Sequence, residues 1–293
     1  MAARAKKTQD LPPFLRQVLG NKFRRRREAL KLSREQVGQK LDIADYTVMR
    51  HETGDTLITV PLVRAYCDVY EITDDQERTE LIELAKMGKQ RGWWTTYGGS
   101  LQPSYSYVVE AEQMSRFGSG IRTWEPLIVP GLFQTDEYTG ALFERSQLIW
   151  KEDNPLPLDQ AVESRAKRKL LLDGDNPPQI WAILGEGAIR TPIGGPDVMD
   201  RQIRHLLDLC ERPNITIQIV PYDTGYNPGT DGPFVLYSFS KAADDGVVYY
   251  EVSRSFSDDV ATLARHTRQF DLLRAQGTHL AQAQRYLHDA LSS

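Results

Sequence analysis

Four side chains between residues 45 and 50 could do chemistry that no hydrophobic core requires: Asp45, Tyr46, Met49 and Arg50. On a helix they would share one outward face. The guanidinium of Arg50 could donate two hydrogen bonds to guanine, and the carboxylate of Asp45 could accept one from cytosine. Asp45 has an alternative role, which we favour, because an acidic residue stabilises the positive amino end of a helix. This face therefore indicates side chains suited to reading bases in DNA.

The elements that would position this face lie in "SREQVGQKLDIADYTVMRHETG", residues 33–54. Ser33 and Gln36 have the spacing of a capping box, which predicts a helix over about 33–41. A second short helix is expected over about 44–53. Two short helices with a tight break between them can project the second helix into the major groove of B-DNA.

The crossing of these two helices has its own residue requirements. Gly38 is expected where the helices approach each other, because a large side chain there would push them apart. Ile43 and Val48 can form a hydrophobic staple, and Gly54 supplies a left-handed stop. The side chains expected to turn inward are Val37, Leu41, Ile43 and Val48.

Helical patterns surround this segment on both sides. "VLGNKFRRRREALKL" predicts an amphipathic first helix with Leu19, Phe23 and Leu30 on its apolar face. "VPLVRAYCDVY" predicts a fourth helix. Thr73 and Gln76 predict a capped fifth helix that stops at Gly88. We therefore expect an all-α domain of five helices over residues 1–87.

The pattern in residues 16–72 resembles the Cro/repressor (Xre-type) helix-turn-helix family. The matching residues are Leu32, Ser33, Val37, Leu41, Ile43, Thr47, Val48, Glu52 and Gly54. The resemblance implies that Arg34 lies over a DNA phosphate and that Arg27 pairs with Glu52 to brace the first helix. It also implies that the base-facing side chains are Asp45, Tyr46, Thr47, Met49 and Arg50.

Three positions depart from the family pattern. Gly38 replaces the usual alanine, which should weaken the second helix by up to ~1 kcal/mol. Ala44 replaces the usual capping Ser or Thr, so Asp45 is expected to cap instead. His51 replaces an aliphatic residue, and we expect it to be a core or hydrogen-bonded histidine rather than a pH switch.

The run "RRRR" at residues 24–27 has two interpretations. It could be a solvated helix face, or it could contact phosphates beside the helix-turn-helix. We favour phosphate contacts, with Arg24 and Arg25 as the candidates. Residues 1–60 carry 13 Lys/Arg and 7 Asp/Glu, a net charge of +6, whereas the remaining 23 Lys/Arg and 33 Asp/Glu give −10. This asymmetry favours a small polyanion-binding domain on an acidic body over two domains that merely differ in charge.

Composition excludes several protein classes. No apolar run reaches the length of a membrane span, and the basic start has no secretory apolar stretch. Cys67 and Cys210 are far apart and lack histidines at ligand spacing, so we expect no structural metal, no cofactor and a cytoplasmic location.

Residues 88–103, "GKQRGWWTTYGGSLQP", are rich in glycine and predict a linker. From residue 104 to 293, helical and β-rich segments alternate. This alternation predicts an α/β domain with a mixed sheet flanked by helices, and an α+β multidomain chain overall. The segment "GYNPGTDGPF" lacks nucleotide-binding spacing and is better explained as a hairpin between two strands.

The search for catalytic residues in this part favours a protein that is not an enzyme. Glu186 and Glu251 follow β-rich runs, where catalytic acids occur, but turn or salt-bridge roles are the better interpretation. No serine lies in a nucleophile elbow. Four histidines are scattered without metal-ligand spacing: His205, His266, His279 and His288.

A second resemblance covers about residues 104–276. "EPLIVPGLFQTDEYTGALF", followed by "SRAKRKLLL", "ITIQIVP", "VVYYEV" and "FDLLRAQ", resembles the WhiJ-like regulators of Streptomyces and other actinomycetes. The family joins an Xre-type domain to a C-terminal domain in an arrangement called antitoxin-like. The resemblance implies regulation of development or specialised metabolism through a small protein partner.

Two hypotheses remain for residues 104–293. A small protein could dock on an exposed apolar surface that includes Trp93, Trp94 and Trp124, or a small molecule could occupy a pocket lined by the Tyr/Phe-rich strands. Together these observations predict a homodimeric transcriptional regulator, a repressor, that binds double-stranded DNA with repeated half-sites. The alternative is an antitoxin-like interaction module whose main role is to bind a small partner protein.

Overall fold

The computed structural model describes residues 14–89, 92–94, 97, 103–116, 120–150, 157–174, 176–239 and 246–291. These form two compact units, the first ending at Ala111 and the second beginning at Glu112. The division falls inside helix α6 (Pro103–Met114). Much of the segment predicted as a linker, including residues 98–102, lies outside the described residues.

Five helices form the main part of the first unit, as predicted for this region of the chain. Apolar residues at helical spacing build its core, in which Phe23 of α1 stacks on Tyr66 of α4 with ring centroids 4.7 Å apart. Val37, Val48 and Val63 are fully buried around this pair. The helices are α1 (Phe14–Ala29), α2 (Arg34–Leu41), α3 (Asp45–Glu52), α4 (Val60–Val69) and α5 (Asp75–Lys89).

Two helix ends differ from the prediction. Leu30, expected on the apolar face of the first helix, lies beyond its last residue and is 40% exposed. The fifth helix is capped by Asp74 rather than Thr73, since the Asp74 carboxylate accepts a hydrogen bond from the Glu77 amide at 2.7 Å. The same helix continues through Gly88, which is buried against α1.

A six-stranded mixed sheet organises the second unit and confirms the predicted fold class. Its order is β3-β2-β1-β4-β5-β6. The first three strands pair in parallel, and the remaining pairings are antiparallel. The strands are β1 (Gly120–Glu125), β2 (Ile180–Gly185), β3 (Ile215–Val220), β4 (Phe234–Ser238), β5 (Gly246–Tyr250) and β6 (Ser255–Ser257).

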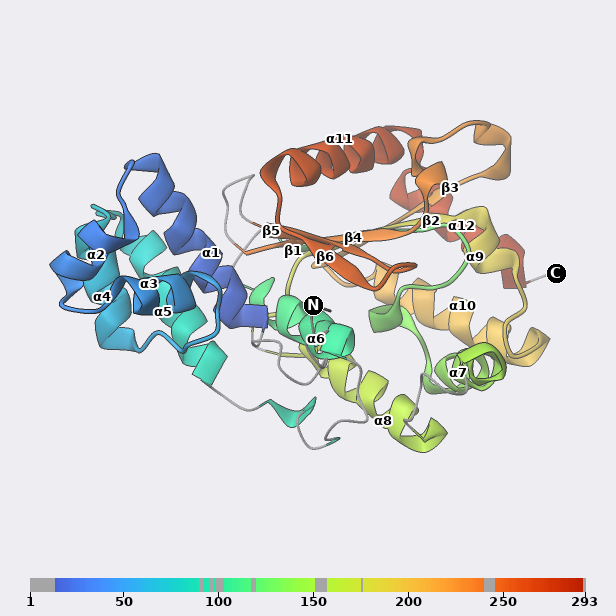
Figure 1. Cartoon of the computed structure of the whole chain (residues 1–293). Coiled ribbons are helices and arrows are strands. Elements are labelled where there is room, and N and C mark those ends of the chain that lie inside the picture. The colour runs from blue at the N-terminus through green and yellow to red at the C-terminus, as the bar shows by residue number, and fades with distance from the viewer. Residues whose placement is uncertain are drawn as a thin grey trace, which may run out of the picture. The chain divides into compact units, whose positions relative to one another are not determined.

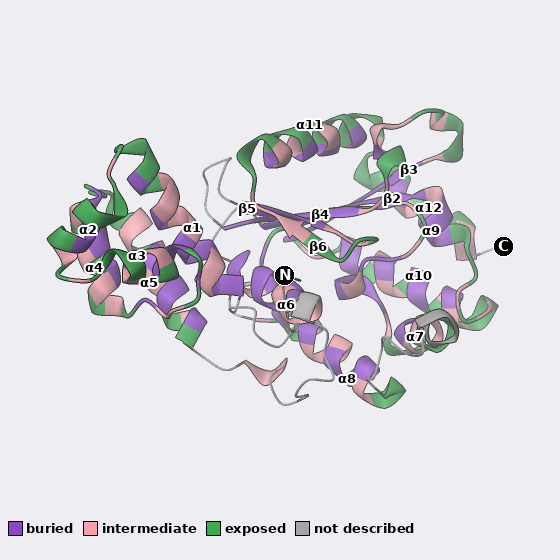
Figure 2. Ribbon diagram, in the orientation of Figure 1, coloured by how far each residue is buried: buried purple, intermediate pink, exposed green. Residues whose placement is uncertain are grey.

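Helices cover both faces of this sheet (Figure 1). Helix α11 (Val260–Gln276) lies on one face, and α8 (Leu158–Lys169) and α10 (Pro196–Cys210) lie on the other. The central strands are buried almost throughout, whereas α11 alternates buried and exposed positions (Figure 2). The remaining helices of the unit are α7 (Asp136–Trp150), α9 (Glu186–Arg190) and α12 (Leu280–Leu291).

Trp124, expected on an exposed docking surface, is instead part of the core under α11. Its side chain is 2% exposed, and its Nε1 donates a hydrogen bond to the Gly229 carbonyl at 2.9 Å. The expectation of an exposed Trp124 was therefore wrong. The physical reason is the alternation of β1, which directs Trp124 towards Phe270 and Leu273 of α11.

The predicted hairpin at "GYNPGTDGPF" was also wrong. This segment joins β3 to β4, but two other strands, β2 and β1, separate them in the sheet. The segment is therefore a crossover. Turn-forming residues indicate that the chain changes direction, but they do not specify which strand the next one pairs with.

Candidate nucleic-acid interface

The helix-turn-helix is built from strong local signals. The Ser33 hydroxyl accepts a hydrogen bond from the Gln36 amide at 3.1 Å, and the Gln36 side chain accepts one from the Ser33 amide at 2.8 Å. This reciprocal capping box starts α2. The helix ends at Asp42, which adopts the left-handed conformation with φ of 54° and turns the chain towards α3. Aspartate tolerates that conformation better than most residues.

Gly38 lies at the closest approach between α2 and the turn. A Cβ atom at this position would come within 2.6 Å of the Ile43 carbonyl oxygen and 3.3 Å of the Asp45 amide nitrogen. Because both neighbours are backbone atoms, they cannot move aside easily. The absence of a side chain at Gly38 thus sets the distance between the two helices.

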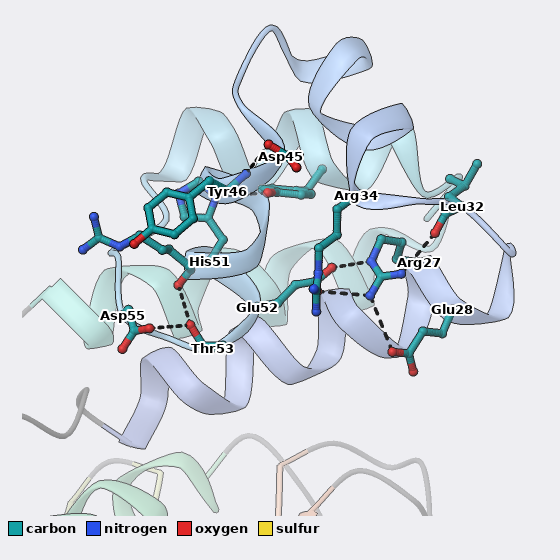
Figure 3. A network of polar contacts seen from close by, with 12 residues as sticks. Arg27, Glu28, Leu32, Arg34, Asp45, Tyr46, His51, Glu52, Thr53 and Asp55 are labelled. Carbon is teal, nitrogen blue, oxygen red and sulfur yellow. Dashed lines mark hydrogen bonds and ion pairs between the residues drawn. The ribbon is translucent and has the colours of Figure 1, made fainter. Parts of the chain in front are cut away.

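The outward face of α3 presents the side chains singled out in the sequence. Asp45, Tyr46 and Arg50 are exposed, with Tyr46 exposed by 62%. Thr47 and Met49 are half-buried beside them. Figure 3 shows Tyr46 and Asp45 together at the start of α3, away from the buried Glu52 at its end. An exposed aromatic ring next to an arginine and a carboxylate offers both apolar contact and hydrogen bonding to bases.

Asp45 occupies the positive end of α3. Its carboxylate accepts a hydrogen bond from the Tyr46 amide at 2.8 Å, while Ala44 at the N-cap position makes no side-chain capping bond. This geometry suits the helix-end role and leaves the side chain exposed. Glu35 and Asp42 lie with Asp45 around a hollow beside the turn, and three carboxylates there disfavour a phosphate.

Glu52, the last residue of α3, connects three helices (Figure 3). Its carboxylate accepts hydrogen bonds from Arg27 Nε at 2.5 Å and Arg27 Nη2 at 3.1 Å. It also accepts one from Arg34 Nε at 2.8 Å. Arg27 in turn donates to the Leu32 carbonyl at 3.1 Å. Since Glu52 is 1% exposed, this buried network fixes α3 against α1 and the start of α2.

Arg34, expected over a phosphate, is therefore also an internal partner of Glu52. Its side chain remains 42% exposed, whereas that of Arg27 is 11% exposed. The Glu52 carboxylate raises the pKa of Arg27 through their hydrogen bond. The pairing of Arg34 with Glu52 was not anticipated, because residues eighteen positions apart come together only when the helices cross.

The basic run at residues 24–27 divides into two pairs. Arg26 makes two hydrogen bonds of 2.8 Å to the Glu77 carboxylate of α5, and Arg27 binds Glu52. Arg24 and Arg25, the phosphate candidates, are half-buried on α1. Two of the four arginines thus hold the helices together.

His51 is a buried, hydrogen-bonded histidine, as expected. Its Nδ1 lies 3.0 Å from the Tyr66 hydroxyl, and the side chain is 4% exposed. Burial lowers the pKa of His51, and the charge of Arg50 lowers it further. The imidazole therefore stays neutral near pH 7 and does not act as a switch there.

Gly54 follows α3 with φ of 77° and also contacts α1 closely. A Cβ atom there would lie 2.8 Å from the Gln17 amide nitrogen. Gly20 of α1, which the sequence interpretation missed, faces the carbonyls of His51 and Glu52 at similarly close range. The available signal was a glycine inside an otherwise regular helical pattern, which often marks close packing.

Two further observations concern metal sites and membrane spans. Within the described ranges, no three His, Cys, Asp or Glu side chains are grouped so that they could hold a metal ion. Among the described helices, none combines the length and apolarity that a bilayer crossing needs.

Comparison with known families gives two matches. A model described as a helix-turn-helix domain matches residues 18–81, which include α2 and α3. A model described as a domain of unknown function (DUF5753) matches residues 106–289, well over half of the chain. No curated protein and no solved structure matches. A helix-turn-helix domain with this exposed second helix indicates a DNA-binding regulator.

Proposed function

This chain belongs to the DUF5753 family and carries a helix-turn-helix domain, and we propose that it is a sequence-specific transcriptional regulator that inserts α3 into the major groove. The observation that carries the proposal is the polar, exposed face of α3 on a helix whose other face is buried. The Glu52 network supports it, because a recognition helix must keep its angle to the domain while it contacts DNA.

In the proposed complex, Arg50 reads guanine, and Tyr46, Thr47 and Met49 contact neighbouring bases. Asp45 stabilises the start of α3 and lies close enough to accept from cytosine. The phosphate contacts come from Arg24, Arg25 and the exposed part of Arg34. A single unit of this size neutralises few phosphates, so the protein acts as a homodimer on repeated half-sites about one helical turn apart.

The proposed regulator is a cytoplasmic repressor and not an enzyme. Its C-terminal domain controls DNA binding by binding a small protein or a small molecule. The resemblance to the WhiJ-like regulators of Streptomyces supports a role in development or specialised metabolism. A ligand can change DNA affinity only if it binds the DNA-competent and incompetent forms unequally.

The test is selection of fragments from a genomic library by the purified full chain at low ionic strength. We expect recovery of a small set of fragments that share a repeated motif. Weak binding without sequence preference and without salt dependence would contradict the proposal. That result would favour the alternative function, an antitoxin-like interaction module whose main partner is a small protein.

A first prediction concerns Arg50 in the selected site. Arg50→Ala should weaken specific binding by ~1–3 kcal/mol, on the order of 5-fold to 150-fold, and relax the preference at one base pair. The measurement is a gel-shift titration on the selected site and on single-base variants. Arg204→Ala is the matched control, because Arg204 is an exposed helical arginine of the other unit, paired with Asp200. Unchanged site preference in Arg50→Ala would remove Arg50 from the reading set.

A further inference from the structure

The sheet face opposite α11 carries polar side chains that the proposed DNA-binding function does not use. Strand β1 alternates, so Trp124 points towards α11 while Thr123 and Glu125 lie on the other side. Thr123 pairs across the sheet with Val235 of β4. Thr123, Val235 and Glu125 all border a small cavity of about 30 Å³, which we call the Glu125 pocket.

Two charged side chains that border this pocket, Arg168 and Glu112, form an ion pair with each other. Arg168 of α8 donates from Nε to Glu112 at 3.0 Å and from Nη2 to the same carboxylate at 2.5 Å. Both side chains are buried, with 7% of Arg168 and 2% of Glu112 exposed. This bidentate pair is neutral as a unit and accounts for its own charges.

Glu125 is different, because among the described residues no arginine makes a bidentate pair with it, although the charge of Arg165 acts on it. The residue is 3% exposed, and its Oε2 makes no hydrogen bond within the part of the chain that the structure describes. The Thr123 hydroxyl on the same face is equally buried and also makes none within these residues. Burying polar atoms without hydrogen bonds is costly, so two such atoms at one cavity point to a ligand that would satisfy them.

Glu251, directly after β5, adds a second carboxyl group to the pocket. Burial raises the pKa of Glu125 well above its ordinary value, and the neighbouring Glu251 raises it further, whereas the charge of Arg165 lowers it. Burial raises the pKa of Glu251 as well, although Arg165 and Arg168 act in the opposite direction. Both shifts favour the protonated carboxyl, whereas a bound cation favours the carboxylate, so a cation in the pocket would promote loss of a proton from the pair.

The volume of the pocket limits the size of the cation that it could hold. A volume of about 30 Å³ holds one or two groups the size of a water molecule. The described residues show no grouping suited to a metal ion. An ammonium group fits this volume and brings three N–H donors. The apolar walls that could contact the rest of such a ligand are Ile121, Pro130, Leu132, Phe133, Ile180 and Val235.

We propose that the Glu125 pocket binds the primary ammonium group of a small organic amine. Glu125 and Glu251 accept two of its N–H groups, and the Thr123 hydroxyl accepts the third. Binding converts the protonated carboxyl of the pair to a carboxylate and releases that proton to solvent. The binding step is independent of DNA recognition, and only its regulatory consequence rests on the proposed function.

The first experiment measures thermal unfolding of the full chain at pH 7 with increasing methylammonium chloride, whose two non-hydrogen atoms match the volume of the pocket. We expect Tm to rise by roughly 5 °C or more at about one hundred times the Kd. Tetramethylammonium chloride at equal ionic strength is the control, because it carries the same charge but is larger and has no N–H donor. No rise with methylammonium, or an equal rise with both salts, would overturn the proposal.

The second experiment uses Glu125→Gln, which keeps the size of the side chain and removes its charge. We expect this variant to fold and to lose the rise in Tm with methylammonium. Glu186→Gln is the matched control, since Glu186 begins α9 outside the pocket and binds Arg190 and the Tyr222 amide. A full response in Glu125→Gln would overturn the proposal. If Glu125→Gln does not fold, Thr123→Val serves instead, with an expected loss of affinity of several fold and the same overturning result.

The third experiment measures how many protons are released when the amine binds. Calorimetric titration in two buffers of different ionisation enthalpy should show release of up to about one proton per amine bound at pH 7. Binding without proton release would overturn the assignment to the Glu125–Glu251 pair. The titratable or charged groups that border or act on this pair are Glu112, Tyr138, Arg165, Arg168, Tyr237, Tyr249 and Arg254.

Discussion

At the scale of single residues, Glu52 has the largest structural role in the DNA-binding unit. Its buried carboxylate accepts hydrogen bonds from Arg27 of α1 and Arg34 of α2. The two arginines are not equivalent, because the side chain of Arg27 is 11% exposed and that of Arg34 is 42% exposed. Loss of Glu52 would leave the Arg27 charge buried without a partner, whereas Arg34 could turn to solvent.

We therefore predict that substitutions of Glu52 and Arg34 lower the stability of the helical unit by unequal amounts. Glu52→Gln should lower the free energy of unfolding of the helical unit by ~3–5 kcal/mol, as expected when one partner of a buried ion pair is removed. Arg34→Ala should cost less than ~1 kcal/mol, because partly exposed pairs contribute little. Urea unfolding followed by circular dichroism measures both. Equal losses in the two variants would show that the buried and the exposed arginine contribute alike.

At the scale of elements, Gly38 decides how closely α2 approaches the turn. An alanine here would favour the helix by up to ~1 kcal/mol, but its Cβ would lie 2.6 Å from the Ile43 carbonyl oxygen. We predict that the clash dominates and that Gly38→Ala lowers stability by ~1–3 kcal/mol. The measurement is urea unfolding, with Gln39→Ala on the exposed side of α2 as control. A stabilised Gly38→Ala protein would mean that the turn can move.

A second prediction at this scale concerns α6 and α1. The Glu110 carboxylate of α6 accepts a hydrogen bond from the Leu15 amide in the first turn of α1 at 3.1 Å. Burial raises the pKa of Glu110 from 4.5 to about 7, although this hydrogen bond and the charge of Arg16 lower it. A raised carboxyl pKa means that the folded state holds its proton more tightly than the unfolded state does.

Stability should therefore fall as pH rises between about 4.5 and about 7. Below this window the Glu110 carboxyl is protonated in both the folded and the unfolded state. Above it the carboxyl is ionised in both states, and the folded state is then destabilised by the full amount of about 3 kcal/mol. Glu110→Gln removes this contribution, so it should match the wild type near pH 4 and exceed its stability at pH 8. The measurement is urea unfolding across this pH range. Parallel pH profiles for the two proteins would contradict the prediction.

At the scale of the whole molecule, the uneven charge should control DNA binding. Residues 1–60 carry a net charge of +6 and the rest carries −10, so attraction to DNA is local and strongly screened by salt. The logarithm of the binding constant should fall linearly with the logarithm of salt concentration, with a slope of about −0.9 per phosphate contacted.

Arg24→Ala should reduce the magnitude of this slope by about 1 without changing site preference. Arg26→Ala is the matched control, because the neighbouring Arg26 is already paired with Glu77. Gel-shift titrations at four or so salt concentrations measure the slope. Equal effects of the two substitutions would show that the internal pairing of Arg26 does not withhold it from DNA.

The sequence by itself determined the helix-turn-helix, because its signals are local. The Ser33–Gln36 capping box and the apolar residues Val37 and Val48 all lie in one short segment, residues 33–48. The alternation of helical and β-rich segments likewise predicted a mixed sheet in the second unit. Each of these features depends on hydrogen bonds and side-chain periodicity that adjacent residues specify.

The tertiary structure alone decided which distant residues meet. The order of the strands, the burial of Trp124 and the sharing of Glu52 by Arg34 were not predictable from local patterns. From the sequence Glu125 looks like any strand-end carboxylate, and only the tertiary structure places it beside β2, buried and near Glu251. Such contacts depend on how helices and strands pack together. Packing decides which charges lie near a side chain and how much solvent reaches it, whereas distance along the chain does not.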